Sequence, residues 1–275
     1  MIRAIDVRVR LATLIFATIA AASGAPASLA ADGSDGKWHF TVTPYLWLPD
    51  VYGTVNFTDA GSTGGTISTD AAPDNYLQSL DFAAMFAAEA RKDRFLIFSD
   101  YIYLHFSGHD SVVKSVSGPL GDVHVPVNVA GAASLISNVW TIAGGYNLVH
   151  TPAVSLDLLG GARLLNLRTS VSWDFAGPVG GFAKSGTASQ NTNTWDGLVG
   201  LKGEVRLGEG KWFMPYYADI GTGSNNWTWQ ALLGVGYRFG WGDLVLTVRS
   251  LSYDFDDDRL DARFTGPAFG ASFRF

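Results

Sequence analysis

The sequence predicts an all-β protein, a transmembrane antiparallel up-and-down β-barrel of about ten strands. Charged residues make up 16% of the chain while aromatic residues make up 13%, and a soluble globular protein has about 25% charged residues. Beyond the N-terminus no run of about 18 apolar residues occurs that could form a membrane-spanning helix. Instead, several segments alternate between apolar and polar residues, as in a strand with one face toward lipid.

The clearest alternation runs from Trp227 to Phe239. Its odd-numbered positions are apolar or aromatic and its even-numbered positions include Thr228, Gln230 and Arg238. Residues 154–164 and 195–207 repeat the pattern. Because successive side chains of a strand point to opposite faces, each segment has one face suited to acyl chains and one suited to a polar interior. A closed barrel also satisfies every backbone hydrogen bond without a free edge.

Ten such segments follow one another along the chain. The predicted strands are residues 38–57, 79–91, 94–107, 133–147, 153–175, 193–207, 211–221, 226–239, 243–255 and 262–275. Connections after the second, fourth, sixth and eighth strands are short, whereas those after the first, third and fifth are long and polar. This asymmetry is typical of outer-membrane barrels, with short periplasmic turns and longer outer loops. Eight or twelve strands also fit, because residues 66–69 and 123–129 could extend the hairpins.

The second segment has a competing interpretation, since residues 81–91 are rich in Ala, Met and Glu and read as a helix on propensity alone. As a strand, it pairs with the third segment across a Lys92-Asp93 turn, with Arg91 opposite Arg94. That pairing puts Phe82 and Phe86 on one lipid-like face with aromatic residues of the third segment.

Aromatic residues gather near both predicted ends of the strands. Trp212, Tyr237, Phe239 and Trp241 lie near the short turns, and Trp195, Trp227 and Trp229 lie near the opposite rim. Outer-membrane barrels carry two such aromatic girdles at the membrane interfaces. A soluble β-sandwich is the alternative, but its core would not require aromatic rings at both ends of the strands.

The N-terminus has the three parts of a secretory signal. Arg3, Arg8 and Arg10 precede an apolar stretch at 11–22, and Ser28-Leu29-Ala30 suits signal-peptidase cleavage. An uncleaved membrane anchor is the alternative, but the apolar stretch is short and runs into Gly24 and Pro26. The predicted domains are therefore a cleaved signal peptide at 1–30 and an outer-membrane barrel at 31–275.

The charge balance excludes one class of partner. The predicted exported chain has 16 basic and 24 acidic residues, a net charge of −8. A nucleic-acid-binding surface needs clustered positive charge, so no nucleic acid is expected as a partner. The chain has no Cys, which removes disulfides, thiolate metal sites and cysteine nucleophiles.

The last strand carries a recognisable pattern. Phe269, Ala271, Phe273 and Phe275 alternate along one face and end the chain. This ending resembles the C-terminal signature by which bacterial outer-membrane barrels are recognised by the insertion machinery. Thr43-Pro44-Tyr45-Leu46-Trp47 resembles a family of largely uncharacterised proteobacterial outer-membrane barrel proteins. General similarity to small opacity-protein-like and OmpA-like barrels implies the fold and location, with outer-membrane lipid and lipopolysaccharide as partners, but no reaction.

Ten charged residues are predicted to face the barrel interior. They are Glu89, Asp100, Asp157, Glu204 and Asp219, with Arg163, Lys202, Arg238, Arg249 and Arg274. Because an isolated buried charge is very costly, five acids and five bases favour an ion-pair network that fills the barrel. The alternative is a constriction that selects small solutes. Ten strands lie nearer to the closed eight-stranded barrels than to the open channels of 16 to 18 strands.

The outer loops offer two further candidates. Asp254, Asp256, Asp257, Asp258 and Asp261 resemble a metal-binding run, but an EF-hand would require Gly at Arg259 and Glu at Thr265, so no metal or cofactor is expected. Together with those Asp residues, His105, His109 and Asp110 could form a water-activating Asp/His site like that of ten-stranded outer-membrane proteases. The sequence therefore predicts a structural, surface-exposed barrel or narrow passive pore without catalytic residues, with a rim hydrolase as the alternative.

Overall fold

A computed structural model describes residues 36–57, 65–71, 80–108, 116–118, 121–123, 130–174, 185–224, 226–255 and 260–275. The predicted signal peptide at 1–30 lies outside these residues. Contacts divide the chain into Met1–Gly33 and Ser34–Phe275, and all the described strands belong to the second unit. Within the described ranges, no helix is long and apolar enough to cross a membrane.

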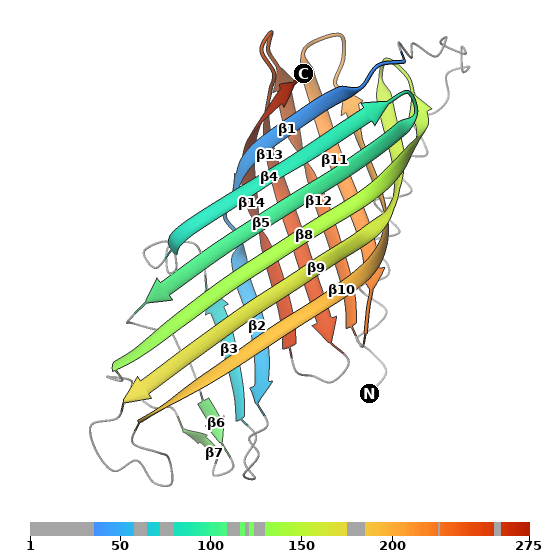
Figure 1. Ribbon diagram of the computed structural model, residues 1–275. Helices are drawn as coiled ribbons and strands as arrows, with labels where there is room; N and C mark the ends of the chain where they lie inside the picture. Colours follow the sequence, from blue (N-terminus) through green and yellow to red (C-terminus); the bar gives the residue numbers. More distant parts are fainter. Residues whose placement is uncertain are drawn as a thin grey trace. The chain divides into compact units, whose positions relative to one another are not determined.

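The second unit is a closed antiparallel barrel, as predicted (Figure 1). Each strand of the ring pairs with its neighbours in chain order, and the ring closes where β1 pairs with β14. The ten strands of the ring are β1 (His39–Trp47), β4 (Leu80–Lys92), β5 (Phe95–Gly108), β8 (Ala130–His150), β9 (Val154–Asp174), β10 (Ser185–Arg206), β11 (Trp212–Thr222), β12 (Asn226–Arg238), β13 (Asp243–Phe255) and β14 (Leu260–Arg274). These correspond to the ten predicted segments.

Four further strands extend the sheet beyond the ring. They are β2 (Asp50–Phe57), β3 (Gly65–Ala71), β6 (Val116–Gly118) and β7 (Gly121–Val123). β2 continues β1 in the same register along β14, with Trp47 opposite Ala268 and Asp50 opposite Thr265. The first predicted segment therefore forms two strands, β1 and β2, that lie along β14 and are separated at Pro49. A proline has no backbone N–H to donate to the hydrogen bonds between strands.

The segment 80–92 is a strand, so the helical interpretation is wrong. Backbone pairing with β1 on one side and with β5 on the other outweighs the intrinsic helix propensity of Ala and Met. The predicted turn was displaced by one residue: Lys92 pairs with Phe95 and Arg91 with Leu96, so Asp93-Arg94 forms the turn. Asp93 adopts the left-handed conformation with φ of 55°, which Asp tolerates in a tight turn. The lipid-like side chains of the two strands still lie on the same side of the sheet. Moving the turn by one residue changes each pairing partner by two positions, and side chains two positions apart in a strand share a face.

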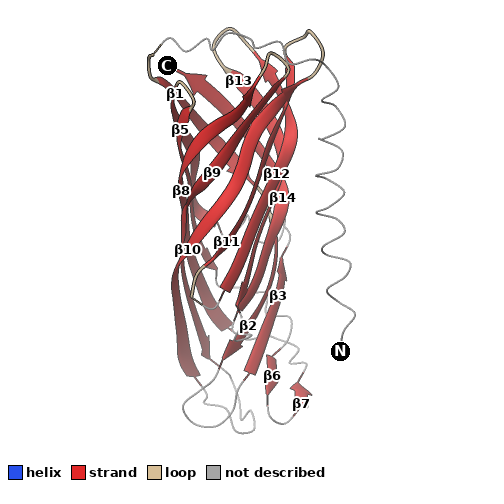
Figure 2. Ribbon diagram, turned by 90° about the vertical axis from the view of Figure 1, so that its right-hand side faces the viewer, coloured by secondary structure: helices blue, strands red, loops and turns tan. Residues whose placement is uncertain are grey.

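Both ends of the barrel sequence lie at the end with the short turns. The backbone N–H of Phe275 donates to the carbonyl of Phe40 at 2.8 Å, and the N–H of Phe40 donates to Phe275 at 3.1 Å. The long strands β8, β9 and β10 have 21, 21 and 22 residues. At about 3.3 Å per residue and a tilt of about 40° they rise about 50 Å, roughly twice the apolar band of such barrels. Figure 2 shows these strands running toward the end opposite the short turns.

A chain of aromatic rings lies at the end with the short turns, along β11 to β14. The rings of Trp212, Tyr237, Phe239, Trp241 and Phe273 contact one another in sequence, with centroid separations of 4.9, 4.8, 5.6 and 5.6 Å. Toward the opposite rim, Trp195 and Trp227 are 52% and 46% exposed. The two predicted groups of aromatic residues therefore occupy separate levels of the outer wall.

Candidate functional site in the barrel interior

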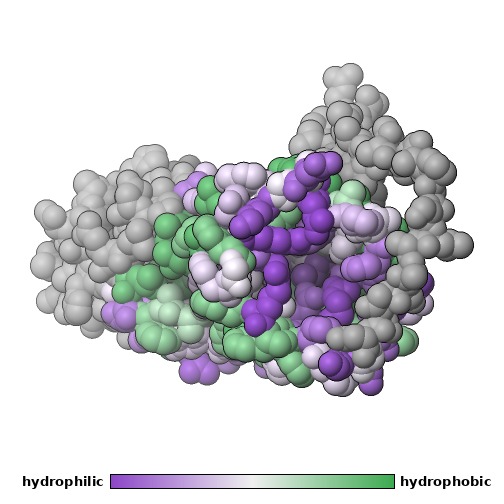
Figure 3. Space-filling model, turned by 90° about the horizontal axis from the view of Figure 1, so that it is seen from above, coloured by the Kyte–Doolittle hydropathy of each residue, from purple (hydrophilic) through white to green (hydrophobic). Residues whose placement is uncertain are grey.

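The barrel wall separates apolar from polar side chains. On β12, the side chains of Trp227, Leu233 and Val235 are exposed, whereas Thr228 and Gln230 are buried. Seen from the end with the short turns, hydrophilic side chains gather around the mouth of the barrel and apolar residues cover much of the flank (Figure 3). The candidate site is therefore the interior, where the polar faces of the ten strands converge.

The first interior cluster is built around Arg163 on β9, which is fully buried. Its guanidinium pairs with the carboxylate of Asp219 on β11 and donates to Thr141 Oγ1 at 3.0 Å and Thr228 Oγ1 at 3.3 Å. The Tyr217 hydroxyl donates to the same Asp219 oxygen at 2.5 Å. Four strands thus hold one ion pair whose charges have little access to water.

The second cluster crosses the interior from β13 to β5. Arg249 Nη2 lies 2.5 Å from Asp100 Oδ2, and both side chains are at most 5% exposed. The Tyr45 hydroxyl donates to Asp100 at 2.6 Å and accepts from Arg249 at 2.8 Å. Arg249 also donates to Gln230 at 2.8 Å and lies 5.0 Å from the Trp47 ring centroid. β13 and β5 are four places apart in a ring of ten, so this pair is a chord across the barrel.

A third cluster lies nearer the short turns. Arg91 bridges Glu89 at 2.9 Å and Asp157 at 2.6 Å, and Lys202 contacts Glu89 at 2.6 Å. Asn147 donates a further hydrogen bond to Asp157 at 2.6 Å. Since Glu89 is on β4 and Lys202 on β10, this contact also spans four places around the ring. At the same end, separate pairs join Arg238 to Glu204 and Arg274 to Asp243.

Apolar side chains fill the spaces between these charges. One buried group contains Leu96, Phe98, Ala143, Leu159 and Tyr217. Another contains Trp47, Met85, Ile102, Val139, Leu165, Leu251, Tyr253 and Ala268. The Phe98 and Tyr217 rings are 5.7 Å apart although their strands are four places apart. The interior therefore contains packed layers of apolar side chains as well as charges.

All ten charged residues proposed from the sequence for the interior take part in these ion pairs. Sequence reasoning missed Arg91 and Asp243, which complete two of the pairs, and Tyr45, which bridges a third. Asp196, which accepts from Asn226 at 2.7 Å, was also left out of the predicted network. The alternation of side chains along a strand could have identified both charged residues. Arg91 shares the inward face of Glu89, and Asp243 shares the inward face of Arg249.

The residues of the predicted C-terminal signature lie on the outer wall. Phe269, Phe273 and Phe275 are 55%, 38% and 76% exposed, and Ala271 shares their face. Leu246 on β13 pairs with Phe269 and is also exposed. This places the signature on an apolar surface beside the seam where β14 meets β1.

The predicted catalytic group is only partly within the described residues. His105 Nε2 lies 3.8 Å from Asp81 Oδ2, and both side chains are more than one third exposed. His105 shares the face of the exposed Ile97, and Asp254 shares that of Leu246 and Val248, so both point away from the interior. His109, Asp110 and Asp256 to Asp258 lie outside the described residues, as do the side-chain surroundings of Asp261. Where the chain is described, no group of three acidic, His or Cys side chains could hold a metal ion.

The fold is similar to that of one solved outer-membrane protein, and others match with lower scores. The outer membrane protease OmpT from Escherichia coli matches with a TM-score of 0.53 and 9% identity, over 90% of this chain and 100% of that chain. The translocator domain of the autotransporter NalP from Neisseria meningitidis matches with a TM-score of 0.40 and 16% identity, over 94% and 97%. Ail, the attachment invasion locus protein of Yersinia pestis, matches with a TM-score of 0.34 and 12% identity, over 86% and 98%.

No family model matches the sequence, and no curated protein matches it. At 9% identity, the likeness to OmpT shows the barrel fold alone. The geometry and the likeness to OmpT together describe a ten-stranded barrel whose interior holds ion pairs and clusters of buried apolar side chains.

Proposed function

We propose that this protein is an integral outer-membrane barrel that acts as a closed structural scaffold, exposed at the cell surface, rather than as an open pore or an enzyme. The observation that carries the proposal is the chord from Arg249 to Asp100 across the interior. It is supported by the buried pair between Arg163 and Asp219 and by the apolar layers around both.

The outer surface supports the membrane location. Val199, Leu233, Val248 and Phe269, on four different strands, are each more than half exposed. In water this much exposed apolar surface would be costly, whereas acyl chains would cover it. The short turns would face the periplasm and the long connections would face outside the cell, after removal of the signal peptide at 1–30.

The interior supports the closed state. For ions to pass, water must form a continuous path through the layer that contains Arg249, Asp100 and Tyr45. Opening that layer would separate two buried charges that satisfy one another, and an unpaired buried charge costs several kcal/mol. We therefore expect the barrel at rest to conduct no ions. Its function as a surface-exposed scaffold would then depend on the long connections at the outer end.

Conductance of the refolded protein tests this proposal. In planar bilayers we expect no stable unitary current steps above the background of protein-free membranes. Flotation with liposomes and a shift in gel mobility between boiled and unboiled samples establish insertion and folding in the same preparation. Stable, reproducible steps from protein that passes both controls would show that the lumen conducts, and the closed-scaffold proposal would be wrong.

The terminal Phe gives a separate prediction about assembly. Phe275 is 76% exposed and its backbone is hydrogen-bonded to Phe40, so Phe275→Ala removes the aromatic ring while leaving the seam between β14 and β1 intact. If the insertion machinery reads this ring, the amount of folded barrel in the outer membrane should fall severalfold.

Phe239→Ala is the matched control, because Phe239 is an exposed aromatic at the same end but not in the last strand. Both variants should refold in detergent as well as the parent. Equal outer-membrane levels for the parent and both variants would contradict a role of Phe275 in recognition.

A further inference from the structure

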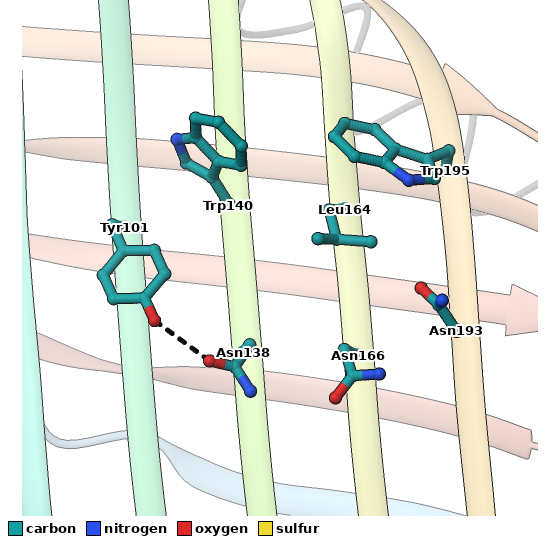
Figure 4. Close-up of a pocket in the computed structure, with 7 residues that line it drawn as sticks. All are labelled: Tyr101, Asn138, Trp140, Leu164, Asn166, Asn193 and Trp195. Carbon is teal, nitrogen blue, oxygen red and sulfur yellow. Dashed lines mark hydrogen bonds between the residues drawn. The ribbon is translucent and has the colours of Figure 1, made fainter.

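A groove lies on the outer wall of β5, β8, β9 and β10 (Figure 4). It has a volume of about 350 Å³ and two cross-strand rows of side chains line it. The first row is Tyr101, Trp140, Leu164 and Trp195; the second is Asn138, Asn166 and Asn193, as the strand registers require. The indole rings of Trp140 and Trp195 are 6.4 Å apart, on either side of Leu164.

The groove lies at the edge of the apolar wall. On β10, exposed or partly exposed apolar side chains alternate outward from Val205 through Val199 to Trp195, and Asn193 is next on that face. The ten residue steps from Val205 to Trp195 rise about 25 Å at the usual rise and tilt of barrel strands, which matches the height of the apolar band. The Asn row therefore falls at headgroup depth, on the side of the long connections.

An aromatic girdle accounts for the Trp residues but not for the row of amides. Tyr101 donates to Asn138 at 3.0 Å, whereas Asn166 and Asn193 have no side-chain hydrogen bond to any residue that the structure describes. Each of these two amides has two N–H donors and one carbonyl acceptor. On neighbouring strands they lie about 4.8 Å apart, so they present a row of donors and acceptors toward whatever molecule lies beside the wall.

The neighbouring residues define the chemistry of that molecule. Leu164 between two indoles suits an acyl chain, and indole faces also pack well against the C–H face of a sugar ring. Arg168 follows Leu164 and Asn166 on the same face of β9, is exposed, and has no ion-pair partner among the described residues. A guanidinium in that position suits a phosphate group. Apolar, hydroxyl-binding and phosphate-binding side chains thus follow one another outward along the wall.

We propose that this groove binds the headgroup of a phosphorylated glycolipid from the outer leaflet. The Asn row would hydrogen-bond the saccharide, the acyl chains would lie along Leu164 and the two Trp residues, and Arg168 would pair with a phosphate. This inference rests on the proposed outer-membrane location. It extends the proposed function by assigning a specific lipid site to one side of the barrel.

Native mass spectrometry of the full refolded chain tests the site, with diphosphorylated lipid A as the probe and phosphatidylglycerol as an anionic lipid without a sugar. We expect one lipid A per barrel, bound at least tenfold more tightly than phosphatidylglycerol. N166L/N193L should weaken lipid A binding about tenfold, since two hydrogen bonds to neutral groups are lost. Arg168→Gln should weaken it severalfold for the diphosphorylated probe.

Two variants on other parts of the wall serve as matched controls. Trp227→Leu removes an exposed Trp near the same rim on β12, and Arg263→Gln removes an exposed, outward-facing Arg on β14. Both should bind lipid A as the parent does. Gel mobility of boiled and unboiled samples confirms that every variant is folded.

Three results would overturn the glycolipid site. Equal affinity for phosphatidylglycerol and lipid A would mean that the barrel attracts any anionic lipid and does not recognise the sugar. Unchanged lipid A binding by N166L/N193L would mean that the lipid binds elsewhere on the barrel. A two-barrel species that is lost in N166L/N193L would make the groove an interface between copies of this chain. Failure of flotation would instead count against the proposed location, so the two failures are distinguishable.

Discussion

Replacing Arg163 with Met is expected to lower the free energy of unfolding of the barrel by about 3 to 5 kcal/mol. Arg163 is fully buried, and Asp219, its partner, has no exposed side-chain surface. The variant would leave the Asp219 carboxylate in the interior with the Tyr217 hydroxyl as its remaining donor among the described contacts. A buried carboxylate without its cation keeps the desolvation penalty and loses the attraction that offset it.

Urea titration of the barrel in lipid vesicles, followed by Trp fluorescence, measures this loss. Arg238→Gln is the control, because Arg238 and Glu204 also form an ion pair but their side chains are 24% and 35% exposed. An ion pair that water reaches contributes about 1 kcal/mol or less. R163M/D219N should recover part of the loss by removing the unpaired charge. Equal losses for R163M and R238Q would contradict the conclusion that burial sets the strength of these pairs.

Gly161→Ala is expected to destabilise the barrel by about 1 to 3 kcal/mol or more, the range for overpacking. A Cβ atom at Gly161 would lie 2.1 Å from the carbonyl oxygen of Ile142 and 2.5 Å from Cα of Ala143. Both are backbone atoms of β8, which cannot move aside as a flexible side chain could. The substitution must therefore push β8 and β9 apart within one of the longest paired regions of the wall.

The neighbouring residue provides the control. A Cβ at Gly160 would meet no atom within 4 Å, and Ala reduces the conformational entropy of the unfolded chain relative to Gly. Gly160→Ala should therefore change the free energy of unfolding by less than about 1 kcal/mol, in either direction. The same urea titration compares the two variants, and the prediction fails if they have equal midpoints.

Most of the wall could be predicted from the sequence because its signal is local. Trp227 to Phe239 shows the alternation on its own, and its lipid-like and polar faces are those that the structure exposes and buries. The turn at Asp93-Arg94 was displaced by one residue, because several adjacent polar residues there suit a turn. The helical propensity of residues 81–91 was overridden by strand pairing on both sides.

The interior was less accessible to sequence reasoning. The alternation of side chains along each strand places Leu96, Leu159 and Leu165 inside the barrel. The sequence did not lead us to expect that such apolar residues would pack together in clusters there. The charged residues could be assigned to the interior, but not to their partners. Arg249 and Asp100 are separated by 149 positions in the chain, so no spacing pattern joins them. The amide row of the outer groove depends in the same way on the registers of β8, β9 and β10.

The sequence by itself determined that alternating strands would form a wall with one apolar and one polar face, since that property repeats every two residues and needs no distant partner. Only the tertiary structure decided which side chains meet across the interior and which line up on the outside. Those contacts depend on the curvature and stagger of the closed sheet, which bring together strands that lie far apart in the chain.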